Sequence, residues 1–176
     1  MPVTVPRYTL RDLESFPDDG SRYELLDGVL LVTPAPARLH QLVVSRIVRQ
    51  LGGYLPATTA DIFSPGVLEV EPNVHLEPDI LVVPAGAAGP EAAWTEIRSW
   101  WLAVEVSGES KLYDRDHKTP AYLQLGVREV WRVDLRERRM FVSVSDNVEQ
   151  PQAEQVSWLP PGRQDPLVIT IPDLFR

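Results

Sequence analysis

The sequence predicts an α/β fold of the α+β kind, in which a mixed sheet is flanked by helices. Strand-like segments outnumber helical ones, a long amphipathic helix precedes the central strands, and a second helix follows them. The 176 residues are enough for one domain with an ordinary core, and no linker or internal repeat divides them. We therefore expect a single domain over residues 1–176.

The amino-terminal part carries signals for a short helix and a hairpin. Residues 8–14 are predicted to be helical, with Thr9 as a capping residue. Asp27-Gly28 separates two short apolar runs, which is the pattern of a two-residue β-hairpin turn. The chain is therefore expected to begin with a helical turn followed by paired strands.

A long amphipathic helix is predicted between residues 37 and 55. Its apolar side chains recur every three or four residues, and Gly52-Gly53 is expected to begin its end. His40 extends the apolar stripe towards the sheet, and a histidine in such a place is more often a hydrogen-bonded core residue than a catalyst. The opposite side carries arginines that either contact phosphates or form an ordinary solvated face: Arg38, Arg46 and Arg49.

Most of the remaining chain reads as strands. Strands are expected near residues 67–70, 79–83, 101–107, 129–134, 140–145 and 167–171. A charged stretch after the third of these leads into a helix that closes at Gly126. Within strand 101–107, alternation places Leu102, Val104 and Val106 on one face and Glu105 on the other.

The composition excludes several classes of protein. There is no cysteine, so disulfide frameworks, thiolate zinc sites and cysteine nucleophiles are excluded. A formal net charge of -8 argues against a protein that coats nucleic acid by bulk attraction. Neither a membrane-spanning apolar run nor a secretion signal is present, so we expect a soluble, cytoplasmic protein with no membrane partner.

Two acidic residues lie in or beside apolar strands, where a carboxylate is costly unless it is paired or bound to metal. Glu105 lies inside an otherwise apolar strand, and Asp79 opens another. Together with the backbone carbonyl of Val106, these groups could hold a hard cation, which prefers oxygen ligands. On spacing alone, an edge-strand glutamate that faces solvent is the commoner case. A rival ligand set is the alternating series His75, Glu77 and Asp79, although Pro78 interrupts strand pairing there.

The segment that follows holds Lys118, one of only two lysines among 17 basic residues. If a helix begins at Asp114, then Asp114, Lys118 and Tyr122 share one of its faces. Thr119-Pro120 also has the pattern of a cap and a first-turn proline, which would start the helix later and separate these side chains. His117 is expected to be exposed. The sequence does not decide between these two starts of the helix.

Six segments in a fixed order carry a family resemblance. They are YELLDG (23–28), PAPARLH (34–40), EPDILVV (77–83), LAVEVS (102–107), DRDHKTPAY (114–122) and GVREVWRVD (126–134). Together they resemble the Uma-two family, which has a restriction-endonuclease-like core and belongs to the PD-(D/E)XK nuclease superfamily. The resemblance covers roughly residues 8–144.

The resemblance implies a metal site. Pro78-Asp79 matches the PD of the superfamily motif, and Glu105 matches its second acid. These residues would bind Mg²⁺ or Mn²⁺ and activate water for hydrolysis of DNA phosphodiester bonds. Glu24 matches an early glutamate of the family and would complete the metal shell directly or through water.

The motif lysine is displaced in this chain. Ser107 stands two residues after Glu105, where the superfamily has lysine, and Gly108-Glu109 replaces the usual proline that follows. The family resemblance assigns the lysine role to Lys118 on the next helix, to orient the water or neutralise the scissile phosphate. It also gives His40 a supporting place beside the metal ligands.

The leading hypothesis is therefore a metal-dependent endonuclease that acts on DNA, with a homodimer expected because paired sites commonly cut two strands. The missing motif lysine motivates an alternative, a catalytically weak or inactive module of the same fold that binds DNA or protein. The acidic charge motivates a third, a metal-dependent hydrolase of another phosphoester. A cluster of arginines around Trp131 either contacts phosphates or is an ordinary solvated face: Arg128, Arg132, Arg136, Arg138 and Arg139.

Overall fold

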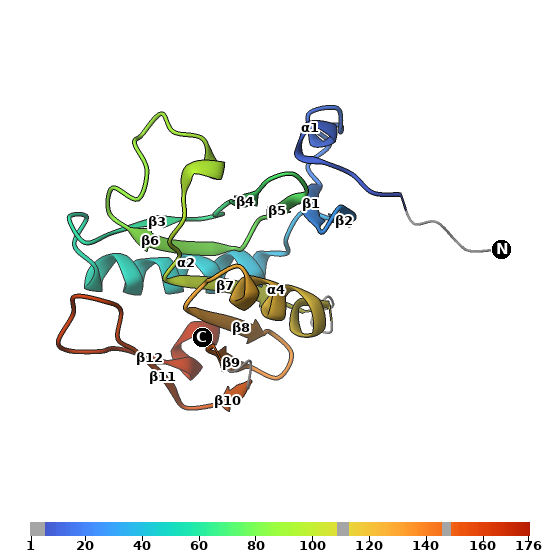
Figure 1. Ribbon diagram of the computed structural model, residues 1–176. Coiled ribbons are helices and arrows are strands. Elements are labelled where there is room, and N and C mark those ends of the chain that lie inside the picture. The colour runs from blue at the N-terminus through green and yellow to red at the C-terminus, as the bar shows by residue number, and fades with distance from the viewer. Residues whose placement is uncertain (1–5, 109–112, 146–148) are drawn as a thin grey trace.

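The computed structural model describes residues 6–108, 113–145 and 149–176, and its strands dominate the architecture (Figure 1). The strands are β1 (Arg22–Leu26), β2 (Val29–Thr33), β3 (Ala60–Phe63), β4 (Leu68–Val70), β5 (Val74–Leu76), β6 (Ile80–Pro84), β7 (Leu102–Ser107), β8 (Glu129–Asp134), β9 (Arg139–Ser143), β10 (Gln150–Gln152), β11 (Gln155–Trp158) and β12 (Leu167–Thr170). The helical elements are α1 (Leu10–Leu13), α2 (Arg38–Tyr54), the 3-10 helices η1 (Trp94–Glu96) and η3 (Ile171–Phe175), the π-helix η2 (Asp114–Lys118), and α4 (Thr119–Gln124).

The smaller sheet has the strand order β2-β1-β5-β4. Its β1–β2 hairpin turns at Asp27 and Gly28, whose φ angles are 51° and 77°. Two consecutive positive φ values match the twist of paired strands, and asparagine, aspartate and glycine tolerate them best. The predicted hairpin is therefore confirmed. Thr9 is likewise the N-cap of α1, with the Asp12 carboxylate accepting from its backbone N–H and its hydroxyl.

The larger sheet has the strand order β10-β9-β8-β7-β6-β3. Strands β7 and β8 are parallel, with Glu105 opposite Arg132, whereas the other described neighbours in this sheet are antiparallel. The parallel pair needs a crossover connection, which η2 and α4 supply. The mixed sheet and its flanking helices confirm the predicted α+β fold class. Of the described helices, none is long and apolar enough to cross a membrane.

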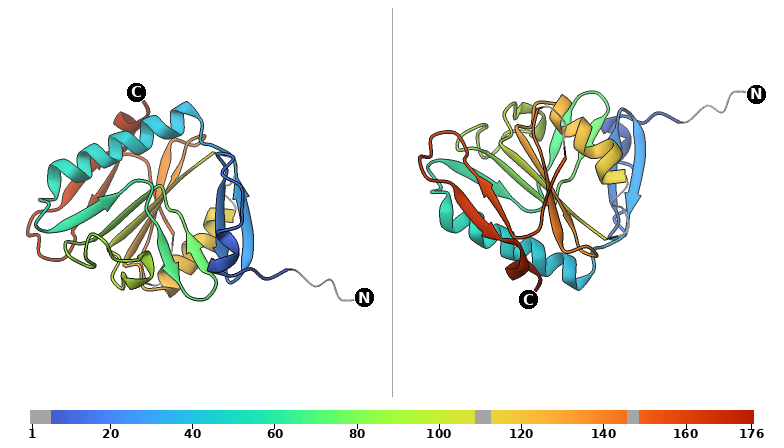
Figure 2. Two further views of the ribbon diagram at one scale, coloured as in Figure 1. Left: turned by 90° about the horizontal axis from the view of Figure 1, so that it is seen from above. Right: turned by 90° about the horizontal axis from the view of Figure 1, so that it is seen from below.

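Strands β6 and β7 are buried on both faces. Ile80, Val82, Leu102, Val104 and Val106 join α2, η3 and the β11–β12 hairpin in one apolar cluster. Side chains of the other parity, such as Leu81 and Ala103, pack with β4, β5, α4 and η1. Figure 2 shows α2 and α4 on opposite sides of the larger sheet. The alternation predicted for strand 101–107 is confirmed, and β7 is an interior strand rather than an edge.

Helix α2 covers nearly the whole predicted range of residues 37–55 and ends one residue after Gly52-Gly53, so this prediction is confirmed. It continues through Gly52-Gly53 to Tyr54 because Leu51 and Leu55 are both buried in the core. The Tyr54 hydroxyl also donates to the carbonyl of Asp165 at 2.6 Å, which fixes this turn. Tertiary packing here outweighs a glycine penalty of about 1 kcal/mol per residue.

Gly66 is expected to tolerate no side chain. Its N–H donates to the carbonyl of Pro78 at 2.9 Å, and an added Cβ would overlap the Cβ of the fully buried Leu81 and lie 3.2 Å from its backbone N. Overpacking of this kind costs about 1–3 kcal/mol, so Gly66→Ala should lower the midpoint of urea unfolding. Gly53→Ala on α2 meets nothing within 4 Å and should raise it. Equal midpoints for Gly66→Ala and the wild type would contradict this close approach.

Candidate active site

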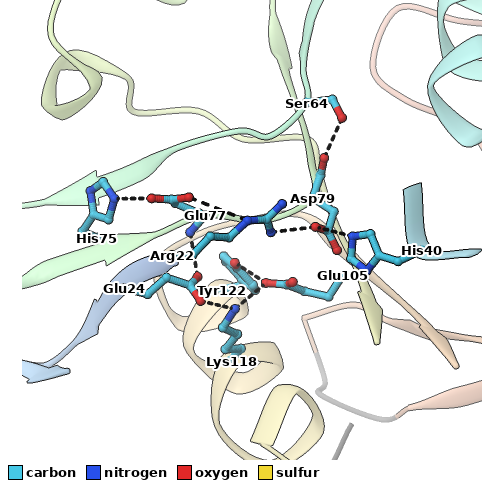
Figure 3. A network of polar contacts seen from close by, with 10 residues as sticks. All are labelled: Arg22, Glu24, His40, Ser64, His75, Glu77, Asp79, Glu105, Lys118 and Tyr122. Atoms are coloured by element: carbon cyan, nitrogen blue, oxygen red, sulfur yellow. Dashed lines mark hydrogen bonds and ion pairs between the residues drawn. The ribbon is translucent and has the colours of Figure 1, made fainter. Parts of the chain in front are cut away.

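The candidate site lies where the chain passes from the smaller sheet into the larger one. Strand β5 ends at Leu76 and β6 begins at Ile80, so Asp79 falls at the junction of the two sheets. Glu24 reaches this point from β1, and Glu105 from β7. Figure 3 shows these three carboxylates directed towards one another, with Lys118 coming from η2. The structure thus brings together the four residues that the sequence indicated.

Asp79 is 3% exposed and accepts hydrogen bonds on both carboxylate oxygens. Its Oδ1 lies 2.7 Å from Arg22 Nη1 and 2.9 Å from His40 Nε2, and its Oδ2 accepts from the N–H of Val106 at 2.8 Å. Burial alone would raise the pKa of Asp79, but the hydrogen bond and charge of His40, the Val106 N–H and Arg22 hold that pKa below its ordinary value. Asp79 is therefore an anion fixed from three sides.

A second group of contacts in the site is centred on Lys118. Its Nζ lies 2.7 Å from Glu24 Oε2 and 3.1 Å from Glu105 Oε1, and the Tyr122 hydroxyl donates to the same Glu105 oxygen at 2.7 Å. Glu24 Oε1 accepts from the N–H of Glu77 at 2.8 Å. Glu24, Glu105 and Lys118 are each at most 5% exposed, so the ammonium offsets one of the two carboxylate charges out of contact with bulk water.

The helix that carries Lys118 begins before Thr119-Pro120. The π-helix η2 runs into α4 without a break, and Pro120 sits in the first turn of α4. Lys118 and Tyr122 consequently share a face and reach the same oxygen of Glu105. The α-helical part does begin at Thr119, with Pro120 in its first turn, but the preceding π-helix keeps Lys118 and Tyr122 on one face. Asp114 is the first residue of η2, and its side chain lies outside what the structure describes.

The secondary candidates have distinct places. His40 Nε2 lies 2.9 Å from Asp79 Oδ1 and donates to this carboxylate, so His40 is a hydrogen-bonded partner of Asp79. Val106, predicted as a metal ligand through its backbone carbonyl, contributes its N–H to Asp79. The Ser107 hydroxyl shares a strand face with Glu105, is buried, and has no hydrogen-bond partner among the described residues. His117 is exposed, as predicted.

Arg22 is the residue of the site that the sequence did not single out. Its side chain is 23% exposed, and besides contacting Asp79 it places Nε 4.0 Å from Glu77 Oε2. Burial alone would lower the pKa of Arg22, but the hydrogen bond to Asp79 and the charges of Asp79, Glu105 and Glu77 raise it. Arg22 and Glu24 are two residues apart on β1 and share a face, so strand alternation was the signal that could have indicated it.

The rival ligand set does not form one cluster. His75 Nδ1 lies 2.7 Å from Glu69 Oε1 and its Nε2 3.1 Å from Glu77 Oε1, while Asp79 is turned towards Arg22 and His40. Within residues 6–108, 113–145 and 149–176, no three histidine or acidic side chains are grouped as a ready-made metal cage. In this arrangement Arg22 and Lys118 lie between the carboxylates (Figure 3).

The pairing of His75 predicts a stability that depends on pH. Burial alone would lower the pKa of His75, but its hydrogen bonds with Glu77 and Glu69 raise it above the ordinary value of 6.5. Its contribution to stability is therefore full below pH 6.5 and is lost as pH rises through the folded-state pKa. In urea unfolding, His75→Gln should cost more free energy at about pH 6 than at about pH 9. The exposed His117→Gln serves as the control, and a His75→Gln cost that does not change with pH would refute the prediction.

The two arginine clusters do not behave as uniform solvated faces. Arg132 is 4% exposed, lies 2.9 Å from Glu149 and stacks over the ring of Phe141 at 4.0 Å. Arg46 donates to the carbonyl of Leu174 at 2.8 Å. The other members are exposed: Arg38, Arg49, Arg128, Arg136, Arg138 and Arg139.

The donor set fits a hard divalent cation. Four carboxylates, those of Glu24, Glu77, Asp79 and Glu105, share the two permanent cations Arg22 and Lys118, which leaves an excess of negative charge at the junction. Carboxylate oxygens suit Mg²⁺ and Mn²⁺. The buried hydroxyl of Ser107 adds a polar group on the face of Glu105 that the described chain leaves unsatisfied.

Comparison with solved structures defines the class of fold. A protein from Anabaena variabilis ATCC 29413, described as a "putative nuclease belonging to DUF820", has a crystal structure similar to this one at a TM-score of 0.75. The two chains are 19% identical, and the similarity covers 99% of this chain and 98% of the other. At this identity the likeness establishes the fold, which is the restriction-endonuclease-like one that the sequence predicted. No curated protein is significantly similar to the chain.

The sequence itself establishes the family. Residues 9–175 match Uma2, whose description is "putative restriction endonuclease". Because this match spans nearly the whole chain, the protein belongs to the Uma2 family. The resemblance carried by the six ordered motifs is thereby confirmed.

Proposed function

We propose that this protein is a divalent-metal-dependent endonuclease that hydrolyses phosphodiester bonds of DNA. The observation that carries the proposal is the meeting of three buried carboxylates, Glu24 from β1, Glu105 from β7 and Asp79 directly before β6, with the ammonium of Lys118. Burying so many charges is costly, and structural stability alone does not require it. Membership of the Uma2 family supports nuclease activity in general.

Each residue has a defined task in this proposal. Asp79 and Glu105 would hold Mg²⁺ or Mn²⁺, with Glu24 completing the shell directly or through water. A bound ion of this kind supplies stabilisation of charge on the phosphate and a more acidic water. Lys118 lies against Glu105 and would orient the attacking water or neutralise the scissile phosphate. The Tyr122 hydroxyl fixes Glu105, and His40 fixes Asp79.

The direct test is cleavage of supercoiled plasmid DNA in the presence of Mn²⁺ or Mg²⁺. We expect nicked and linear products that require the metal and vanish with a chelator. A panel of single-stranded, branched and RNA substrates would then define the preferred nucleic acid. Absence of cleavage of every DNA substrate in both metals would contradict the proposal.

A second candidate, a DNA- or protein-binding module without turnover, is favoured by one observation. Ser107 stands where the superfamily motif has lysine, so catalysis depends on a residue from a different element. Binding of DNA in a gel-shift assay without hydrolysis would support this candidate. The net charge of -8 motivates a third, hydrolysis of another phosphoester, which turnover of such a substrate without nuclease activity would support.

A further inference from the structure

The guanidinium of Arg22 interacts with the two carboxylates that would hold a metal ion, Asp79 and Glu105. Its Nη1 is 2.7 Å from Asp79 Oδ1 and its Nε is 4.0 Å from Glu77 Oε2. It is also close enough to Glu105 for that carboxylate to stabilise its charge. Arg22 therefore interacts with both Asp79 and Glu105, the carboxylates to which we assign the metal.

Asp79 has limited capacity for a further partner. A carboxylate offers about four lone-pair positions, and hydrogen bonds with Arg22, His40 and Val106 use three of those on Asp79, two of them on Oδ1. The Val106 N–H belongs to an interior strand, and His40 is anchored on α2. Arg22 is a partly exposed, flexible side chain, so it is the partner that can leave.

We propose that Arg22 is the resident counter-ion of Asp79 in the metal-free protein and that a divalent cation displaces it in binding to Oδ1, both of whose lone-pair positions are occupied. This inference rests on the metal site of the proposed function and adds a competing ligand within the chain. Arg22 keeps the carboxylates from repelling one another when no metal is present, and it lowers the metal affinity by the same interaction. It acts as a positioning residue through Asp79.

The displaced guanidinium has a second partner. Glu77 Oε2 is already 4.0 Å from Arg22 Nε, and Glu77 is anchored by His75 at 3.1 Å. Arg22 can therefore exchange Asp79 for Glu77 while remaining ion-paired. Figure 3 shows the guanidinium between the two carboxylates, which is the geometry that such an exchange requires.

The test is the affinity for Mn²⁺ alone, measured by calorimetry or by electron paramagnetic resonance on the full chain. Arg22→Gln removes the competing charge and keeps an amide donor, so it should bind Mn²⁺ about tenfold more tightly than the wild type, which corresponds to about 1.4 kcal/mol. Arg22→Lys keeps the charge and should stay near the wild-type affinity. Arg176→Gln removes the same charge from an exposed arginine that pairs with Asp173, and should leave the affinity unchanged.

The outcomes separate this inference from the proposed function. Mn²⁺ binding that Asp79→Asn abolishes but Arg22→Gln leaves unchanged or weakens would overturn the inference and leave the metal site standing. Absence of Mn²⁺ binding by the wild type and by Arg22→Gln alike would overturn both. A crystal of the wild type soaked in Mn²⁺ gives an answer that needs no variant. Loss of the Arg22–Asp79 contact supports displacement, and a metal on Asp79 with that contact intact refutes it.

Discussion

Lys118→Met is expected to slow DNA cleavage strongly and to lower the free energy of unfolding by about 3–5 kcal/mol. Methionine retains much of the length of lysine without its charge. Glu24 and Glu105, which are 1% and 5% exposed, would then face each other with no ammonium between them. Cleavage should fall by about a hundredfold or more because the group that neutralises or orients the reacting phosphate and water is gone.

Plasmid cleavage and urea unfolding measure the two effects of this substitution separately. Arg115→Met removes an exposed cation from the same π-helix and should change neither quantity. Lys118→Arg restores the charge in a planar, bulkier form, so it should recover stability more than cleavage. Wild-type cleavage by a folded Lys118→Met variant would show that the lysine takes no part in the reaction.

Asp79→Asn should weaken Mn²⁺ binding by about a hundredfold or more and reduce cleavage in parallel. Asparagine preserves the volume and one carbonyl oxygen, but it removes the charge that pairs with Arg22 and His40. Its amide nitrogen would also oppose the N–H of Val106 in one of its two orientations. The variant therefore probes the anion at this position while leaving the strand intact.

Metal titration and the plasmid assay test this expectation on the same samples. Asp61→Asn makes the same chemical change on β3, the strand next to β6, and should bind Mn²⁺ like the wild type. If the Asp79→Asn variant bound Mn²⁺ with the affinity of the wild type, the metal ligands would lie elsewhere.

The parts of the site that the sequence predicted are those whose chemistry conflicts with their surroundings. Glu105 was conspicuous because it interrupts an apolar strand, and Asp79 because it opens one. Lys118 stood out as one of two lysines in an arginine-rich chain, and the family motifs then assigned its role. The sequence could not show that Lys118 reaches Glu105, because this depends on where the helix begins.

The parts that the sequence missed are those that tertiary context determines. Strands β3, β5, β10 and β11 are three or four residues long, and none has an alternation long enough to predict it alone. Arg22 looked like an ordinary polar residue at the start of a strand until the sheets placed it beside Asp79. The burial of Arg132 follows in the same way from its position opposite Glu105 on the parallel neighbour.

The crossover between β7 and β8 allows the lysine and the carboxylates of the site to change independently in evolution. Asp79 and Glu105 are attached to strands packed on both faces, whereas Lys118 arrives on the connection between β7 and β8. A change in that connection can remove the lysine while leaving the carboxylates and the sheet in place. Under the proposed function, divergence within such a fold can therefore produce proteins that would bind metal without hydrolysing DNA, and the two properties need to be assayed independently in each relative.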